Sequence, residues 1–251
     1  MQTFEIVGEK KAAHRIIFLH GWGGSRESFR ALAGQLKNTE SILLDIPGFG
    51  STPALDESGS STYDYANWFF DLAQKNSWWE KKTVLYGHSF GCRFLARLLQ
   101  MHPDFPGKII FSNGGGVKLP PSIRVRFIKK CAKIFGSVFH VFPQKAQSFI
   151  RRKILRAHDW DEASETNKKT MKKVLVESDT RDDLAMIKNP VLIFWGKKDM
   201  ITPIREGKIF AEKIPHAEFI VFEDGYHGIH HTHTKKIAKK INQWLEKMLD
   251  S

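Results

Sequence analysis

The stretch that decides the fold is TVLYGHSFGCRFLARLLQ, residues 83–100. Its first four residues form an apolar strand, and a helix is expected to begin at Phe90. Between them, residues 87–91 spell G-x-S-x-G, which makes a sharp strand-to-helix turn and presents the Ser89 hydroxyl above the sheet. By composition alone this motif arises in roughly one chain in ten of this length. It becomes informative because it stands on a strand–helix junction.

Strands and helices alternate on both sides of this junction. The expected strands are 3–9, 15–20, 41–45, 83–87, 108–112, 191–196 and 218–222, and the expected helices are 26–36, 63–76, 90–102, 204–214 and 234–249. Thr62 is the expected N-cap of the helix at 63–76. The last helix carries an apolar stripe at helical spacing: Ile237, Ile241, Trp244, Leu245 and Met248. This alternation predicts the α/β class, with a doubly wound, mostly parallel sheet whose active-site loops follow the carboxyl ends of the strands.

The segment from about 115 to 189 interrupts this alternation. It has no strand-like pattern, several basic helical stretches, and prolines at 120, 121 and 143. We therefore expect a single domain, 1–251, with a helical lid inserted at about 115–189. Residues 117–186 hold 16 Lys and Arg against 8 Asp and Glu, so about 8 of the 12 net positive charges lie in this segment.

The composition is that of an ordinary globular protein, with 41% hydrophobic and 26% charged residues. No apolar run approaches the roughly 18–20 residues of a membrane helix, and the first residues lack a signal-peptide pattern. Cys92 and Cys131 are the two cysteines, which gives no disulfide framework. We expect a cytoplasmic protein with no transmembrane segment.

A serine nucleophile at such a turn needs an acid and a histidine, in the order Ser, acid, His. Asp199 follows the strand VLIFWG, where the alternative reading is a turn aspartate that caps the next helix. His227 follows the strand FIVF and can act as general base while Asp199 holds its tautomer. Asp224 is a poorer acid, because a residue three positions before the histidine is badly placed to orient it.

Acyl transfer also needs backbone donors for the oxyanion, worth about 3–4 kcal/mol each. The glycine-rich segment HGWGG, residues 20–24, lets the Trp22 N–H point into the site, and the Phe90 N–H is the expected second donor. The substrate pocket is expected to include His20, Gly21, His88, Phe127 and Phe135.

The segments HGWGGS, LDIPGFGST, GHSFG, WGKKDMITP and GYH resemble, in order and spacing, the α/β-hydrolase superfamily in its lidded serine esterase and C–C hydrolase branch. The resemblance covers nearly the whole chain except the lid. The HGWG form is similar to that of carboxylesterases acting on pimeloyl esters, whose basic lid engages an acyl-carrier protein. The family usually has Gly-His, followed some residues later by an acidic residue and a proline. This chain departs from that pattern, because Tyr226 precedes His227 and His230, His231 and His233 occupy the following stretch.

The resemblance implies an α/β-hydrolase fold and ester hydrolysis through an acyl-enzyme, with a small-molecule ester as substrate. A C–C bond hydrolase, a perhydrolase and a slow-turnover ligand receptor of the same fold stay open as alternatives. A serine at residue 89 excludes the relatives that use an aspartate nucleophile.

We expect no cofactor and no metal, because no Cys or carboxylate pattern accompanies the histidines of HGIHHTH. The basic lid either is solvated or recruits an acidic partner or anionic substrate. Nucleic acid is not expected, since no recognition motif accompanies the charge.

Overall fold

The computed structural model describes residues 4–9, 11–119, 163–177 and 179–249. The chain divides into two compact units, residues 1–117 together with 165–251, and residues 118–164. The second unit lies almost wholly outside the described residues, and with it Phe127 and Phe135.

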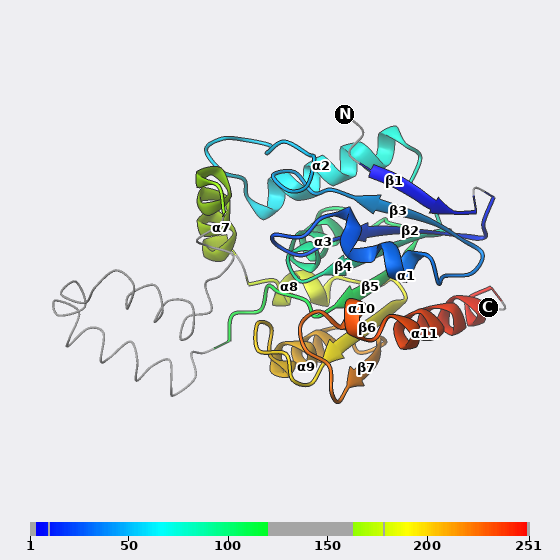
Figure 1. The fold of residues 1–251 in the computed structure, drawn as a ribbon. Coiled ribbons are helices and arrows are strands. Elements are labelled where there is room, and N and C mark those ends of the chain that lie inside the picture. Colours follow the sequence, from blue (N-terminus) through cyan, green and yellow to red (C-terminus); the bar gives the residue numbers. More distant parts are fainter. Residues whose placement is uncertain (1–3, 10, 120–162, 178, 250–251) are drawn as a thin grey trace. The chain divides into compact units, whose positions relative to one another are not determined.

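The first unit is built on a seven-stranded sheet with the order β1-β3-β2-β4-β5-β6-β7 (Figure 1). Strand β1 pairs antiparallel with β3, and all other pairs are parallel. The strands are β1 (Phe4–Gly8), β2 (His14–Leu19), β3 (Thr39–Leu44), β4 (Thr83–His88), β5 (Lys108–Ser112), β6 (Val191–Gly196) and β7 (Glu218–Phe222). The expected α/β class with a mostly parallel sheet is confirmed.

The burial of the strands explains their sequences. Every residue of β4 and of β6 is buried, as parallel strands covered on both faces require. The edge strand β1 is less covered, and its Ile6 is 43% exposed.

Two groups of helices enclose the sheet (Figure 1). On one side α2 (Thr62–Lys75), α3 (Phe90–Met101), α8 (Arg181–Ala185) and α9 (Ile204–Lys213) contact one another in a row. On the other side lie η1 (Arg26–Phe29), α1 (Arg30–Ala33), α10 (Ile229–Thr232) and α11 (Thr234–Lys247). The apolar stripe of α11 packs into the core as predicted, with Met248 partly buried at its end.

Two helices differ from the prediction, one in its cap and one in its type and length. Helix α2 is capped by Ser61 and not by Thr62, because the Ser61 hydroxyl accepts the Asp64 N–H and the Asp64 carboxylate accepts the Ser61 N–H. The helix expected at 26–36 is a 3₁₀ turn followed by the short α1, which ends before Gly34.

Helix α7 (Glu165–Glu177) lies within the segment that the sequence assigns to the lid, yet it belongs to the first compact unit. The Ser60 N–H donates to the Thr170 hydroxyl at 2.9 Å, and the Lys173 ammonium donates to the Gly59 carbonyl at 2.7 Å. These contacts attach α7 to the loop before α2. None of the helices within the described ranges has the length and hydropathy that a membrane-spanning helix requires.

The direction of the sheet's winding changes between β2 and β4. The chain passes from β2 to β3 on one side and then returns to β4 on the other side of β2. Loops that leave neighbouring strands at such a switch point diverge and leave a crevice at the carboxyl edge. Here these loops are residues 20–24 and the turn at Ser89.

Candidate active site

Ser89 occupies a strained turn between β4 and α3. Its backbone angles are φ 49° and ψ −109°, a region that non-glycine residues rarely adopt. The turn is held by the Ser89 N–H, which donates to the Ser112 carbonyl at 3.1 Å, and by the Gly115 N–H, which donates to the Ser89 carbonyl at 3.1 Å. A Cβ on Gly91 would stand 2.3 Å from the Leu19 carbonyl oxygen, so α3 approaches β2 only because this residue is glycine.

Asp199 and His227 meet at the ends of β6 and β7. The His227 Nδ1 lies 2.8 Å from the Asp199 Oδ2. Because a carboxylate only accepts, Nδ1 carries the proton, and Nε2 is left as the acceptor that a general base needs. The other Asp199 oxygen accepts the Ile201 N–H at 2.8 Å and the Thr202 N–H at 3.0 Å.

The Asp199 side chain is buried and ionised. Burial raises the pKa of its carboxyl, but hydrogen bonds from His227, Asn113 and Thr202 outweigh this and hold the pKa below its usual value. The Thr202 hydroxyl donates to Asp199 Oδ2 at 2.8 Å.

Asn113, at the end of β5, was missed by the sequence reasoning. Its Nδ2 donates to the Asp199 Oδ2 and to the Tyr226 carbonyl at 3.4 Å. No motif marks this residue. Only its position after a parallel strand, before a run of glycines, could have pointed to it.

Ser89, His88 and His227 lie in one cluster with Gly21. A Cβ on Gly21 would stand 3.1 Å from both the Ser89 Cβ and the His88 Cδ2, and the His88 and His227 rings are 4.8 Å apart. Among the described residues, the Ser89 hydroxyl has no hydrogen-bond partner.

The two residues expected to supply the oxyanion donors have their side chains in contact. The rings of Trp22 and Phe90 are 5.3 Å apart, and neither backbone N–H donates a hydrogen bond within the described part of the chain. The Phe90 N–H belongs to the first turn of α3, where helix amides have no internal partner and the helix dipole favours negative charge.

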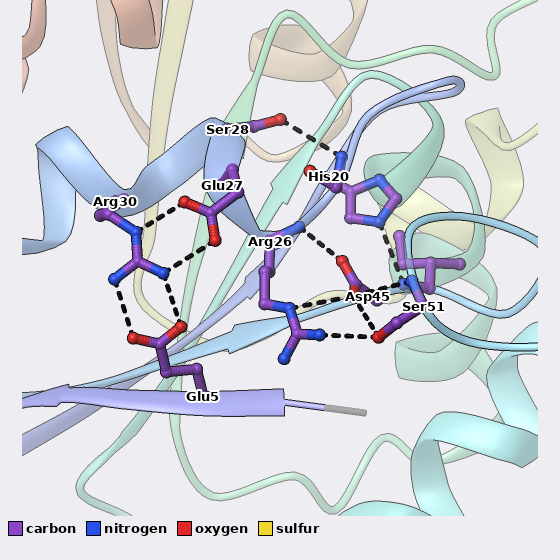
Figure 2. Close-up of polar contacts among 10 residues, drawn as sticks. Glu5, His20, Arg26, Glu27, Ser28, Arg30, Asp45 and Ser51 are labelled. Atoms are coloured by element: carbon purple, nitrogen blue, oxygen red, sulfur yellow. Dashed lines mark hydrogen bonds and ion pairs between the residues drawn. The ribbon is translucent and has the colours of Figure 1, made fainter. Parts of the chain in front are cut away.

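His20 is fully buried and supports the loop after β3 (Figure 2). Its Nε2 accepts the Ile46 N–H at 3.0 Å, and its Nδ1 donates to the Gly21 carbonyl at 2.8 Å. Burial lowers the pKa of His20 to about 4, so the ring is neutral. With both ring nitrogens engaged, His20 holds two loops together and has no free polar atom for a substrate.

His88 is also buried and neutral. Its Nδ1 donates to the Ser112 carbonyl at 3.0 Å, and burial holds its pKa well below the usual value. His230 packs between the rings of His88 and Phe29, at 4.3 and 4.9 Å, and burial lowers its pKa to about 3.

The remaining histidines of HGIHHTH do not gather around a metal position. His233 Nε2 lies 3.0 Å from the Asp224 Oδ1, outside the Asp199–His227 pair. In the described ranges, no group of three His, Cys, Asp or Glu side chains is arranged to hold a metal ion. Cys92 is a free, buried thiol.

Comparison with known proteins gives consistent matches. The family model described as Hydrolase_4, serine aminopeptidase S33, matches residues 10–233. A pimeloyl-[acyl-carrier protein] methyl ester esterase of Chromobacterium violaceum is 24% identical, covering 92% of this chain and 94% of that protein. Protein ABHD8 of Mus musculus is 25% identical over 85% of this chain, which spans about half (51%) of that relative's length.

Among solved structures, an esterase from Exiguobacterium antarcticum superposes with a TM-score of 0.72 at 19% identity, covering 97% of this chain and 94% of that one. At this identity the likeness shows a shared fold.

Proposed function

This chain belongs to the Hydrolase_4 family (serine aminopeptidase, S33), and from that premise we propose that it cleaves carboxylic esters with Ser89, His227 and Asp199. The family and the fold make the chain an α/β-hydrolase. The ester substrate and the roles of the three residues are the proposal.

The proposed reaction is a two-step acyl transfer. The Ser89 hydroxyl attacks the ester carbonyl and gives its proton to His227 Nε2, while the Trp22 and Phe90 amides donate to the oxyanion. The carbon–oxygen bond then breaks, and the leaving alcohol takes the proton from His227. Water attacks the acyl-enzyme by the same route and releases the acid and free Ser89.

The observation that carries the proposal is the 2.8 Å contact from His227 Nδ1 to the buried Asp199 carboxylate. It fixes the tautomer that leaves Nε2 basic, at the sheet edge where the strained turn presents Ser89. The Chromobacterium relative, a methyl ester esterase by name and similar over 94% of its length, favours an ester among the substrates of this fold.

In this proposal the chain is one hydrolase domain, and the insertion at about 115–189 selects the substrate. Its basic sequence suits an acidic partner or an ester with an anionic group. The described helices α7 and α8 of this segment pack within the first compact unit. Phe127 and Phe135 lie outside the described residues.

The test is hydrolysis of p-nitrophenyl esters of increasing acyl length by the wild type, Ser89→Ala and the exposed-loop control Ser58→Ala. We expect rapid cleavage by the wild type and the control, and a loss of at least about 10⁴-fold in kcat in Ser89→Ala. Amino-acid p-nitroanilides, tested in parallel, separate an esterase from an aminopeptidase. Ester cleavage that persists in Ser89→Ala, or faster cleavage of the anilides, would contradict the proposal.

A further inference from the structure

We propose that Asn113 is a positioning residue, whose side-chain amide fixes the Asp199 carboxylate and the loop before His227 together. This inference rests on the proposed function, because it assigns the role of Asn113 through the acid and the base of that reaction.

The backbone of Asn113 has a positive φ, which glycine adopts freely and asparagine at a smaller cost than most other residues. Its φ is +46°, in the left-handed region where glycine sits without strain, and Gly114 to Gly116 follow directly. The residue is completely buried, its N–H donates to the Phe194 carbonyl at 3.0 Å, and its carbonyl oxygen lies 3.1 Å from the Thr202 hydroxyl, which shares its one proton between this oxygen and Asp199 Oδ2. A glycine would keep both backbone bonds without the strain, so the asparagine side chain needs a separate explanation.

The side chain is also costly to bury. Its Oδ1 has no hydrogen-bond partner in the described part of the chain, and an unsatisfied buried acceptor destabilises the folded state. Turning the amide over would not help, because Oδ1 would then face the Asp199 carboxylate. Positive φ and unsatisfied buried groups both occur at functional sites, and here both donor bonds of the side chain lie at the candidate site.

The two donor bonds of Nδ2 show what the side chain contributes. One goes to Asp199 Oδ2, the oxygen that also receives His227 Nδ1. The other goes to the carbonyl of Tyr226, the residue directly before His227. One amide therefore joins the loop after β6 to the loop after β7, and it holds the acid against the base.

The hydrogen bond from Asn113 to Asp199 also affects the basicity of the His227 imidazole. A neutral donor withdraws charge from the carboxylate, so less negative charge remains to stabilise a protonated imidazole. Removing the donor should favour the imidazolium, which cannot act as base. The acid limb of the pH–rate profile should then move to higher pH.

Other charged and titratable groups surround this pair, and they stay unchanged in an Asn113 variant. His88 from β4 and His230 from α10 lie on the His227 side. Glu206 from α9 interacts electrostatically with Asp199, and Lys198 lies over the Tyr226 ring at 5.9 Å. A change in the pH profile can therefore be assigned to the substituted amide.

Two variants test the proposal. Asn113→Gly removes the amide and relieves the backbone strain, so it should fold. Asn113→Asp keeps the side-chain shape but replaces the amide by a carboxyl group, which must share a proton with the neighbouring Asp199 carboxylate. The matched control is Asn189→Ala, because the Asn189 Nδ2 also donates to two oxygens, the carbonyls of Phe105 at 2.7 Å and Gly107 at 2.9 Å, but lies before β6 and away from Asp199 and His227.

For Asn113→Gly we expect kcat on p-nitrophenyl esters to fall about 10- to 100-fold, with KM within about twofold. The acid limb of the pH–rate profile should move to higher pH by roughly half a pH unit in this variant. Asn189→Ala should retain the wild-type kcat and acid limb.

A second readout needs no substrate: the low-field proton resonance of His227 Nδ1–H in its bond to Asp199. We expect it in the wild type and in Asn189→Ala, and we expect it shifted or broadened in both Asn113 variants. The inference would be overturned if folded Asn113→Gly kept the resonance unchanged and also had the same kcat and acid limb as Asn189→Ala. Ester cleavage that survives in Ser89→Ala would refute the proposed function instead, and the resonance would still decide the role of Asn113.

Discussion

The Asp224 carboxylate is paired with His233, whose Nε2 lies 3.0 Å from the Asp224 Oδ1, although Asp224 is only three residues from His227. His227 instead contacts Asp199, 28 positions away, at 2.8 Å. Proximity along the chain thus does not decide which carboxylate orients His227.

The two aspartates should therefore differ sharply on substitution. We expect Asp199→Asn to lower kcat/KM on p-nitrophenyl esters by about 10⁴-fold, because an amide cannot hold the required tautomer or stabilise the imidazolium. Asp224→Asn, the matched control, should stay within about threefold of the wild type, because this carboxylate is exposed and away from the pair. The reverse order of effects would assign the acid to Asp224.

Gly91 permits α3 to approach β2, and Gly91→Ala should destabilise the fold. The added Cβ would lie 2.3 Å from the Leu19 carbonyl oxygen, a backbone atom in a central strand. We expect a loss of about 2–4 kcal/mol in the free energy of unfolding, measured by denaturant titration. Gly34→Ala is the control, since its Cβ would meet only the Arg30 carbonyl oxygen at 3.5 Å. An equal loss in both variants would contradict the role of close backbone approach.

Two carboxylate–arginine pairs in Figure 2 should contribute differently to stability. Asp45 is buried and accepts the Arg26 N–H at 2.8 Å, the Ser51 N–H at 3.1 Å and the Arg26 guanidinium at 3.0 Å. Asp45→Ala leaves these donors unpaired and should cost about 2–4 kcal/mol in the free energy of unfolding.

The matched surface pair is Arg30 with Glu27, whose side chains are 46% and 58% exposed. Glu27→Ala should leave the unfolding transition nearly unchanged, because an exposed ion pair is screened by solvent. Equal destabilisation by both substitutions would contradict the importance of burial.

Glu206 should make the stability of the protein depend on pH. It is 8% exposed, and burial raises the pKa of its carboxyl to about 7. The positive charge of Arg93 lowers the pKa but does not offset the effect of burial. Because the folded-state pKa lies above the unfolded value, the stability gained from the neutral form is complete at acid pH and is lost as pH rises through about 7.

The expected result is a fall of up to about 3 kcal/mol in stability between roughly pH 5 and pH 9 in the wild type. Glu206→Gln should abolish most of this fall, whereas Glu212→Gln, on the exposed side of the same helix, should retain it. Thermal unfolding at several pH values measures the effect. A Glu206→Gln protein with the wild-type pH dependence would show that another group is responsible.

Much of the fold could be predicted because its signals are local. Strands β5, β6 and β7 have the predicted bounds, since continuous apolar runs between turn residues mark buried parallel strands. The start of α3 after Ser89 followed from the glycine pattern of the turn. The cap of α2 was misassigned by one residue, because Ser61 and Thr62 are both good caps and only the Asp64 geometry separates them.

The sequence by itself determined the alternating α/β architecture, the strained turn at Ser89, and the chain order in which Asp199 and His227 follow it. These depend on residue periodicity and on glycines at fixed spacing, which act over a few neighbouring residues. Only the tertiary structure decided that His20 is a buried support and that Asn113 joins the Asp199 loop to the His227 loop. Such roles depend on distances between residues far apart in the chain, and those distances are set by how the strands are ordered and packed.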